Sequence, residues 1–151
     1  MLTQEHTILV VDDERANLRM FERLLRNRFT IVCATSGEEA LEILTTRKFS
    51  LLISDHRMPG MTGVELLRKS MALDADMVRM IVTADDGIDT FISALKEGGA
   101  VRVISKPWDP DRMEQAVLNA LQKFEVVKAN RQAIDLLKQA NHLLDKVTRR
   151  A

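Results

Sequence analysis

The segment from Ser50 to Gly63 (SLLISDHRMPGMTG) limits the possible folds more than any other part of the sequence. An apolar run through Leu52 and Ile53 stops at the carboxylate of Asp55, and the turn-forming pair Pro59 and Gly60 follows. This pattern predicts a buried parallel strand that carries one acid to its carboxyl end. Open α/β sheets place their ligand sites at such strand ends.

Four further apolar runs of strand length accompany this segment. Runs of this kind, rich in β-branched residues, are typical of strands covered on both faces. The predicted strands are Thr7 to Val11, Phe29 to Ala34, the run ending at Asp55, Met77 to Val82, and Val101 to Ile104.

Helical patterns lie between these strands and after the last one. Acids at Asp12 to Glu14 should fill the first turn of the first helix, Ser36 and Glu39 form a capping box for the second, and the third begins near Thr62 or Gly63. The fourth covers Asp86 to Glu97 and is closed by Gly98 and Gly99, and the fifth starts at Asp109 and Pro110. Strands alternating with helices predict an α/β fold, a doubly wound five-stranded parallel sheet with five flanking helices, the last of them extended.

Composition agrees with one folded domain plus an additional segment. The chain has 151 residues, 46% of them apolar and 29% charged, and no apolar run reaches the roughly 18 residues of a membrane span. The N-terminus has no signal-peptide pattern, so the expected localisation is cytoplasmic, without membrane insertion. The only cysteine, Cys33, is expected in the core. The net charge of zero gives no indication of direct DNA binding.

Polar side chains end four of the predicted strands. They are Asp12 with Asp13, Asp55, Thr83 and Lys106. Because the ends of parallel strands lie side by side, these residues should converge on one pocket. Crowded carboxylates need a cation among them, and oxygen-only ligation suits Mg²⁺. A carboxylate can also be a nucleophile toward phosphorus, and Lys and Thr can neutralise a phosphoryl group.

Four motifs carry a resemblance to a known family. VVDDE contains Asp12 and Asp13, ISDHRMPGMTG contains Asp55, IVTA contains Thr83, and ISKPW contains Lys106. In this order and spacing, over about residues 6 to 124, the chain resembles the receiver domain of two-component response regulators, the family of the chemotaxis regulator. The resemblance implies the strand order 2-1-3-4-5.

The resemblance also implies a role for each site residue. Asp55 would accept a phosphoryl group from a phosphohistidine on a sensor histidine kinase or phosphotransfer protein. The chain would then be a phosphoacceptor that assists its own phosphorylation and dephosphorylation, and not an enzyme. Mg²⁺ would be held by Asp12, Asp13, Asp55 and the backbone carbonyl of Arg57, and the phosphoryl group by Thr83, Ala84 and Lys106. Thr83 would swing toward the phosphate and report to a face made of helix four, strand five and helix five, which is one expected surface for a homodimer.

One position departs from the family pattern. Receivers usually carry Tyr or Phe three residues before the lysine, as the rotating partner of the threonine, and here that position is Val103. An aromatic rotation is therefore impossible at this switch position. Thr83 and Val103 remain the expected switch residues.

Several of these residues have simpler interpretations. Asp12 and Asp13 could be first-turn helix acids, Lys106 and Pro107 an ordinary turn, and Thr83 a helix cap. His56 follows Asp55 but should point away from it, so a non-catalytic role is expected. The remaining expectations are a charge pair of Arg57 and Asp85 that slows hydrolysis at the pocket mouth, and a surface packing role for Trp108.

The last 27 residues form a separate part of the prediction. A receiver would occupy 1–124, and 125–151 would be a helical extension with Val127, Ile134, Leu137 and Leu144 on one stripe and Asn130 and Asn141 on the same stripe. This pattern predicts a short dimerising coiled coil with a shift in register near Val127. The alternatives are a helix folded back on its own domain or a frayed linker. A downstream effector domain could follow Ala151.

Two functions compete with that of a receiver. A phosphatase of the haloacid dehalogenase type also uses Asp, Thr, Lys and Mg²⁺, but it needs a second aspartate two residues after its nucleophile, where this chain has Arg57. A docking adaptor that works without phosphorylation is the other candidate. Mass analysis after incubation with a small phosphodonor distinguishes the adaptor from a phosphoacceptor.

Overall fold

The computed structural model describes residues 2, 4–84 and 87–150, and it contains the predicted five-stranded parallel sheet. The strands are β1 (Thr7–Val11), β2 (Thr30–Ala34), β3 (Leu51–Asp55), β4 (Val78–Thr83) and β5 (Arg102–Ser105). Their order is β2-β1-β3-β4-β5, and every pairing is parallel. The order implied by the resemblance is confirmed, and each strand begins and ends within one residue of its predicted bounds.

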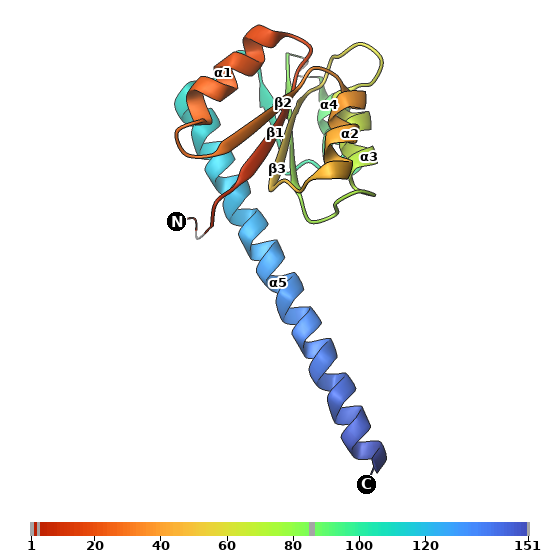
Figure 1. Cartoon of the computed structure of the whole chain (residues 1–151). Coiled ribbons are helices and arrows are strands. Elements are labelled where there is room, and N and C mark those ends of the chain that lie inside the picture. The colour runs from red at the N-terminus through yellow and green to blue at the C-terminus, as the bar shows by residue number, and fades with distance from the viewer. Residues whose placement is uncertain (1, 3, 85–86, 151) are drawn as a thin grey trace.

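The helices alternate with the strands as expected. They are α1 (Arg15–Leu25), α2 (Gly37–Thr46), α3 (Gly63–Ser70), α4 (Ile88–Lys96) and α5 (Pro110–Arg150). Figure 1 shows the sheet between two helical layers, with α5 extending far beyond it. None of the helices in the described part of the chain combines the length and apolarity that a membrane span needs.

Two apolar clusters cover the two faces of the sheet. One joins α1 and α5 to the sheet through buried residues such as Phe21, Met80 and Val117. The other joins α2, α3 and α4 through residues such as Leu44, Leu66 and Ala94. The predicted two-sided covering explains why the central strands β1 and β3 are continuous apolar runs.

Two predicted helix starts need correction. The acids at Asp12 to Glu14 precede α1, which begins at Arg15 with Glu14 as its N-cap. The first helix therefore has no acid in its first turn, because Asp12 lies in the connection after β1 and accepts a hydrogen bond from the Glu14 amide. The fourth helix begins at Ile88 rather than Asp86, and Asp86 itself lies outside the described residues.

Cys33 is only half-buried, because β2 is an edge strand of the sheet. Its thiol donates a hydrogen bond to Glu22 Oε1 at 3.2 Å. Burial, together with this carboxylate, raises the pKa of the thiol to about 12. Cys33 is therefore a neutral residue at the margin of the core.

Candidate functional site

The carboxyl ends of β1 and β3 bring three acids together. Asp12 follows β1 and is 2% exposed, Asp55 ends β3 and is 8% exposed, and Asp13 is exposed beside them. One carboxylate oxygen from each lies within 4.8 Å of the others. Because β1 and β3 are hydrogen-bonded neighbours, their ends are held at this separation by the sheet itself. Three carboxylates at such distances fit the oxygen ligation of a divalent cation.

The structure places Lys106 in contact with two of these acids. Its Nζ lies 2.8 Å from Asp55 Oδ1 and 3.7 Å from Asp12 Oδ2. Burial alone would lower the pKa of the Lys106 ammonium. The hydrogen bond to Asp55 and the charges of Asp55, Asp12 and Glu14 outweigh it, and the pKa is raised. Lys106 is therefore a charged donor in the site at neutral pH.

Asp12 is fixed by local hydrogen bonds that the sequence motif did not reveal. Its Oδ1 accepts from the Glu14 amide at 2.9 Å, and its Oδ2 accepts from Asn17 Nδ2 at 3.0 Å. Burial raises the pKa of Asp12, against the effect of the Glu14 amide, and the neighbouring charge of Asp55 raises it further. Asn17 was missed by the sequence analysis, although its position in the first turn of α1, five residues after Asp12, puts it within reach.

Thr83 ends β4 beside the site, and its side chain is buried. Its carbonyl oxygen accepts from the Lys106 amide at 2.9 Å, so the threonine and the lysine are connected through their backbones. Ala84 is exposed and Val103 is half-buried in β5, where it packs against the apolar cluster under α4. The structure therefore brings Asp12, Asp13, Asp55, Thr83 and Lys106 to one edge of the sheet, as the strand ends predicted.

The loop after β3 approaches the phosphoacceptor candidate closely. The Gly63 amide donates to the carbonyl oxygen of His56 at 2.8 Å, and a Cβ at Gly63 would overlap the carbonyl oxygen of Asp55. Gly60 adopts φ +83°, in the left-handed region that favours glycine. These two glycines allow α3 to begin directly behind Asp55.

His56 and Arg57 follow Asp55 in the chain, and neither belongs to the group of three acids. His56 is half-buried, its Nδ1 has no hydrogen-bond partner in the described structure, and it is not a member of the carboxylate group. Arg57 is exposed, and its expected partner Asp85 lies outside the described residues. The prediction of a charge pair at the pocket mouth therefore stays a prediction.

Trp108 has a larger role than surface packing. Its ring lies 5.0 Å from that of Phe21, and both line a cavity of about 330 Å³ next to the acids. The other lining residues are Asp12, Asn17, Met20, Ala84, Lys106 and Pro107. The cavity shares Asp12 and Lys106 with the site, so the tryptophan lies close enough to respond to changes there.

Comparison with known proteins identifies the family of the chain. The model of the response regulator receiver domain matches residues 8–118. The chain belongs to this family. It is a receiver domain of two-component response regulators, whose members are switched by phosphorylation of an aspartate and act as phosphoacceptors rather than catalysts. This assignment excludes the interpretation as a phosphatase of the haloacid dehalogenase type.

Sequence relatives and solved structures agree with this assignment. The receiver is 33% identical over 138 residues to the hydrogenase transcriptional regulatory protein HoxA of Bradyrhizobium diazoefficiens, covering 91% of this chain and 28% of that protein. It is 35% identical to the C4-dicarboxylate transport transcriptional regulatory protein DctD of Rhizobium meliloti, covering 83% and 27%. The chain thus spans little more than a quarter of these relatives. A CheY-like receiver domain protein of Methanospirillum hungatei superposes with a TM-score of 0.77 at 28% identity, covering 81% of this chain and 98% of that one.

Proposed function

We propose that Asp55 is the phosphoacceptor of this receiver. The observation that supports it best is the position of its carboxylate, 2.8 Å from Lys106 Nζ and next to the acids Asp12 and Asp13. Asp55 is the acid that ends the central strand β3, at the edge where parallel sheets place their ligands. The phosphodonor would be a phosphohistidine on a sensor histidine kinase or a phosphotransfer protein.

The transfer would require little covalent chemistry from the protein. One carboxylate oxygen of Asp55 forms a bond to phosphorus, and the phosphorus–nitrogen bond to the donor imidazole breaks, with its electron pair returning to the ring. Lys106 exchanges its contact with Asp55 for a phosphoryl oxygen, and the Thr83 hydroxyl and the Ala84 amide donate to the others. Lys106 is already charged and within reach, so this exchange costs little reorganisation.

Asp12, Asp13, Asp55 and the backbone carbonyl of Arg57 would hold Mg²⁺ in the same site. A bound divalent cation neutralises charge that accumulates on the phosphoryl oxygens. Two hydrogen bonds within the chain orient the carboxylate of Asp12 in this site. One is donated by the Glu14 amide and the other by Asn17.

The signal would leave the pocket through Thr83 without an aromatic rotor, because Val103 stands in place of the aromatic residue. Phe91, Ile92 and Leu95 of α4 are large exposed apolar residues, so the α4–β5–α5 face is one candidate for homodimer formation. The tail of α5, residues 125–150, is the other. A downstream effector domain is part of this proposal, since the relatives are transcriptional regulators several times longer than this chain.

Intact-mass analysis tests the phosphoacceptor. After incubation with phosphoramidate and Mg²⁺, the protein is expected to gain the mass of one phosphoryl group, and Asp55→Asn is expected to gain none. Asp89→Asn, at an exposed acid on α4, is the matched control and should be phosphorylated normally. No mass gain in the wild-type protein would support the docking adaptor instead. A gain retained in Asp55→Asn would show that another residue is the acceptor.

Light scattering with and without Mg²⁺ and beryllofluoride tests the output step. An increase in mass on adding beryllofluoride would support assembly that depends on phosphorylation. An assembly of the same mass in both conditions would instead favour a constitutive association through the tail, with the signal transmitted as a rearrangement within it.

A further inference from the structure

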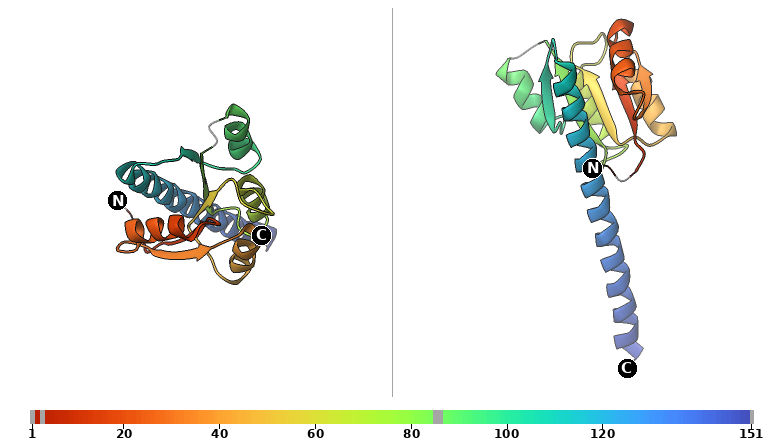
Figure 2. Two further views of the ribbon diagram at one scale, coloured as in Figure 1. Left: turned by 90° about the horizontal axis from the view of Figure 1, so that it is seen from above. Right: turned by 90° about the vertical axis from the view of Figure 1, so that its left-hand side faces the viewer.

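The tail is a single helix that leaves the receiver and projects away from it. Phe124 is the last buried apolar residue of α5 in the described chain, and the helix continues unbroken to Arg150 (Figures 1 and 2). The structure therefore differs from the alternative in which the tail folds back on its own domain. Its large apolar side chains are exposed, with Leu136 at 65%, Leu137 at 64%, Leu143 at 62% and Leu144 at 63%.

These side chains form two apolar seams rather than one. Seam one is the stripe of Val127, Asn130, Ile134, Leu137, Asn141 and Leu144. Seam two consists of Val126, Ala129, Ala133, Leu136, Ala140, Leu143 and Val147. Both follow the alternating spacing of 3 and 4 residues that keeps side chains on one side of a coiled helix. Seam two contains only apolar residues, whereas seam one contains two asparagines.

The two seams have a fixed geometric relation. Each residue of seam two from Val126 to Leu143 directly precedes a residue of seam one, as Leu136 precedes Leu137 and Leu143 precedes Leu144. One residue advances an α-helix by about 100° around its axis, so the seams face directions about 100° apart. A helix in a square bundle of four contacts its two neighbours in directions about 90° apart, as the packing of four-helix bundles requires.

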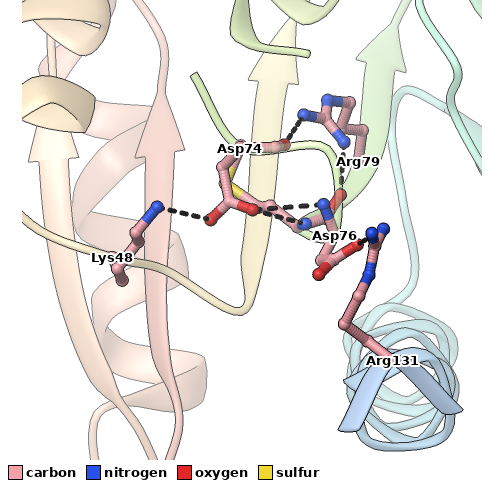
Figure 3. A network of polar contacts seen from close by, with 6 residues as sticks. Lys48, Asp74, Asp76, Arg79 and Arg131 are labelled. Atoms are coloured by element: carbon pink, nitrogen blue, oxygen red, sulfur yellow. Dashed lines mark hydrogen bonds and ion pairs between the residues drawn. The ribbon is translucent and has the colours of Figure 1, made fainter. Parts of the chain in front are cut away.

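The receiver contacts a third side of the tail. Glu125 Oε2 lies 2.7 Å from His6 Nε2, and Arg131 donates to Asp76 Oδ1 at 2.8 Å (Figure 3). Glu125 lies roughly 75° from the centre of seam two and Arg131 roughly 75° from the centre of seam one, so the two contacts flank the side of the helix that faces away from both seams. The domain thus binds the polar side of the tail root and half-covers Val127 there, whereas the later seam residues Ile134, Leu137 and Leu144 are exposed.

We propose that four copies of this chain associate through a four-helix bundle of their tails. Seam one joins two copies into a pair, in which Asn130 and Asn141 meet their counterparts and satisfy each other's amides. Seam two joins two such pairs, and its small residues Ala133 and Ala140 allow close helix packing between the leucine layers. This inference extends the tail association of the proposed function and does not depend on Asp55 being the phosphoacceptor.

A simple pair would leave seam two uncovered. Two-stranded coiled coils bury mainly two positions of every seven. Apolar residues occupy 11 of the 22 positions in 126–147, about half, counting both seams. In the bundle, seam two of one pair packs against seam two of a second, identical pair. The two pairs are then related by two-fold symmetry, and no apolar seam is left exposed.

Light scattering of the full 151-residue chain tests the bundle with matched variants. Leu136→Lys with Leu143→Lys places two charges in seam two, and Gln132→Lys with Gln139→Lys places two charges at the same spacing on the polar side. We expect the wild-type protein and the glutamine variant to have four times the monomer mass. The leucine variant should have twice the monomer mass, because seam one remains intact.

The outcomes separate the bundle from the other proposals. A wild-type dimer whose mass the seam-two lysines do not change would overturn the bundle and leave the pairing through seam one. A monomer would overturn both tail associations, and a trimer would overturn the square geometry. Phosphorylation by phosphoramidate should be the same in all variants. This control shows that the receiver is folded, and failure of the wild-type protein to be phosphorylated would bear on Asp55 alone.

Discussion

At the scale of single residues, Asp12 is an acid whose charged form is disfavoured by its surroundings in the folded chain. It is almost fully buried, and its carboxylate is held 3.7 Å from Lys106 Nζ by two hydrogen bonds that fix its direction. Burial raises its pKa, and the charge of Asp55 adds to this effect. Asp12 is therefore oriented for ligation at some cost in stability, as many functional residues are.

The raised pKa of Asp12 predicts how its substitution changes stability. The folded state binds a proton more tightly than the unfolded state does, so stability falls as pH rises from 3.8 through the folded-state pKa. At pH 7 without metal, Asp12→Asn should therefore raise the Tm. In the wild-type protein Mg²⁺ should raise the Tm by binding the folded state, and in Asp12→Asn this increase should be reduced or lost.

Thermal unfolding with EDTA and then with Mg²⁺ measures both effects. Asp135→Asn, at an exposed acid in the interior of α5, should leave the Tm and its response to Mg²⁺ nearly unchanged. A lower Tm for Asp12→Asn in EDTA would mean that the hydrogen bonds from Glu14 and Asn17 stabilise the fold more than the buried charge destabilises it.

At the scale of elements, the connection from β3 to α3 positions the phosphoacceptor candidate. A methyl group at Gly63 would overlap the carbonyl of Asp55 and approach Ile81 Cδ1 to 2.8 Å and His56 Cα to 2.9 Å. Gly63→Ala should therefore lower the free energy of unfolding by about 1–3 kcal/mol, as overpacking does. It should also slow phosphorylation, because the backbone of Asp55 has to move.

Urea unfolding and the rate of mass gain with phosphoramidate measure these two effects. Glu65→Ala, at an exposed position two residues later in α3, is the control and should change neither quantity appreciably. Wild-type stability and rate in Gly63→Ala would show that the loop can shift without affecting Asp55.

The N-terminus of α2 offers a second prediction for an element. Ser36 Oγ accepts from the Glu39 amide at 3.1 Å, and Glu39 Oε1 accepts from the Thr35 amide at 3.1 Å. The predicted cap thus forms, with the glutamate reaching one residue beyond the N-cap. Ser36→Ala should cost about 1 kcal/mol in urea unfolding. Thr45→Ala at the exposed far end of α2 should cost less than half as much, and equal costs would mean that the cap is not stabilising.

At the scale of the whole molecule, the site and the root of the tail lie at opposite ends of the sheet. The acids follow the carboxyl ends of β1 and β3, whereas His6 and Ser50 precede these strands and meet α5 at Glu125. A five-residue strand separates these ends by roughly 16 Å. A signal from Asp55 to the tail therefore has to pass through the sheet or along α5, which packs on it from Met113 to Phe124.

The buried contact at the tail root predicts where the tail is anchored most strongly. His6 Nε2 donates to Glu125 Oε2 at 2.7 Å, and its Nδ1 is hydrogen-bonded to Ser50 Oγ at 2.8 Å. The His6 side chain is fully buried. Glu125→Ala would leave a buried ring nitrogen without this partner and should cost about 1–3 kcal/mol. Asp76→Ala removes only the exposed ion pair with Arg131 and should cost less than about 1 kcal/mol.

Chemical unfolding of the two variants, monitored by circular dichroism, compares these costs. The difference should persist at high salt, since the exposed pair is screened and the buried contact is not. A larger cost for Asp76→Ala would indicate that the polar loop of Asp74, Asp76 and Arg79 is the main anchor instead (Figure 3).

The sequence alone predicted the fold class and the convergence of Asp12, Asp13, Asp55, Thr83 and Lys106 at one edge of the sheet. Apolar runs ending in Asp12, Asp55, Thr83 and Lys106 sufficed, because parallel strands place their carboxyl ends at one edge whatever the details of packing. It also predicted the long final helix, since no proline or glycine interrupts 111–151. Local signals and strand periodicity carry this information without tertiary contacts.

The tertiary structure decided what depends on neighbours distant in the sequence. The half-buried state of Cys33 follows from the position of β2 at the sheet edge, and the contact of Trp108 with Phe21 follows from α1 packing beside α5. The contacts of His6 with Ser50 and Glu125 join residues 44 and 119 positions apart. Such contacts also decide which side of the tail binds the receiver and which sides remain open. Helical periodicity identifies an apolar face of a helix, but it does not identify what covers that face.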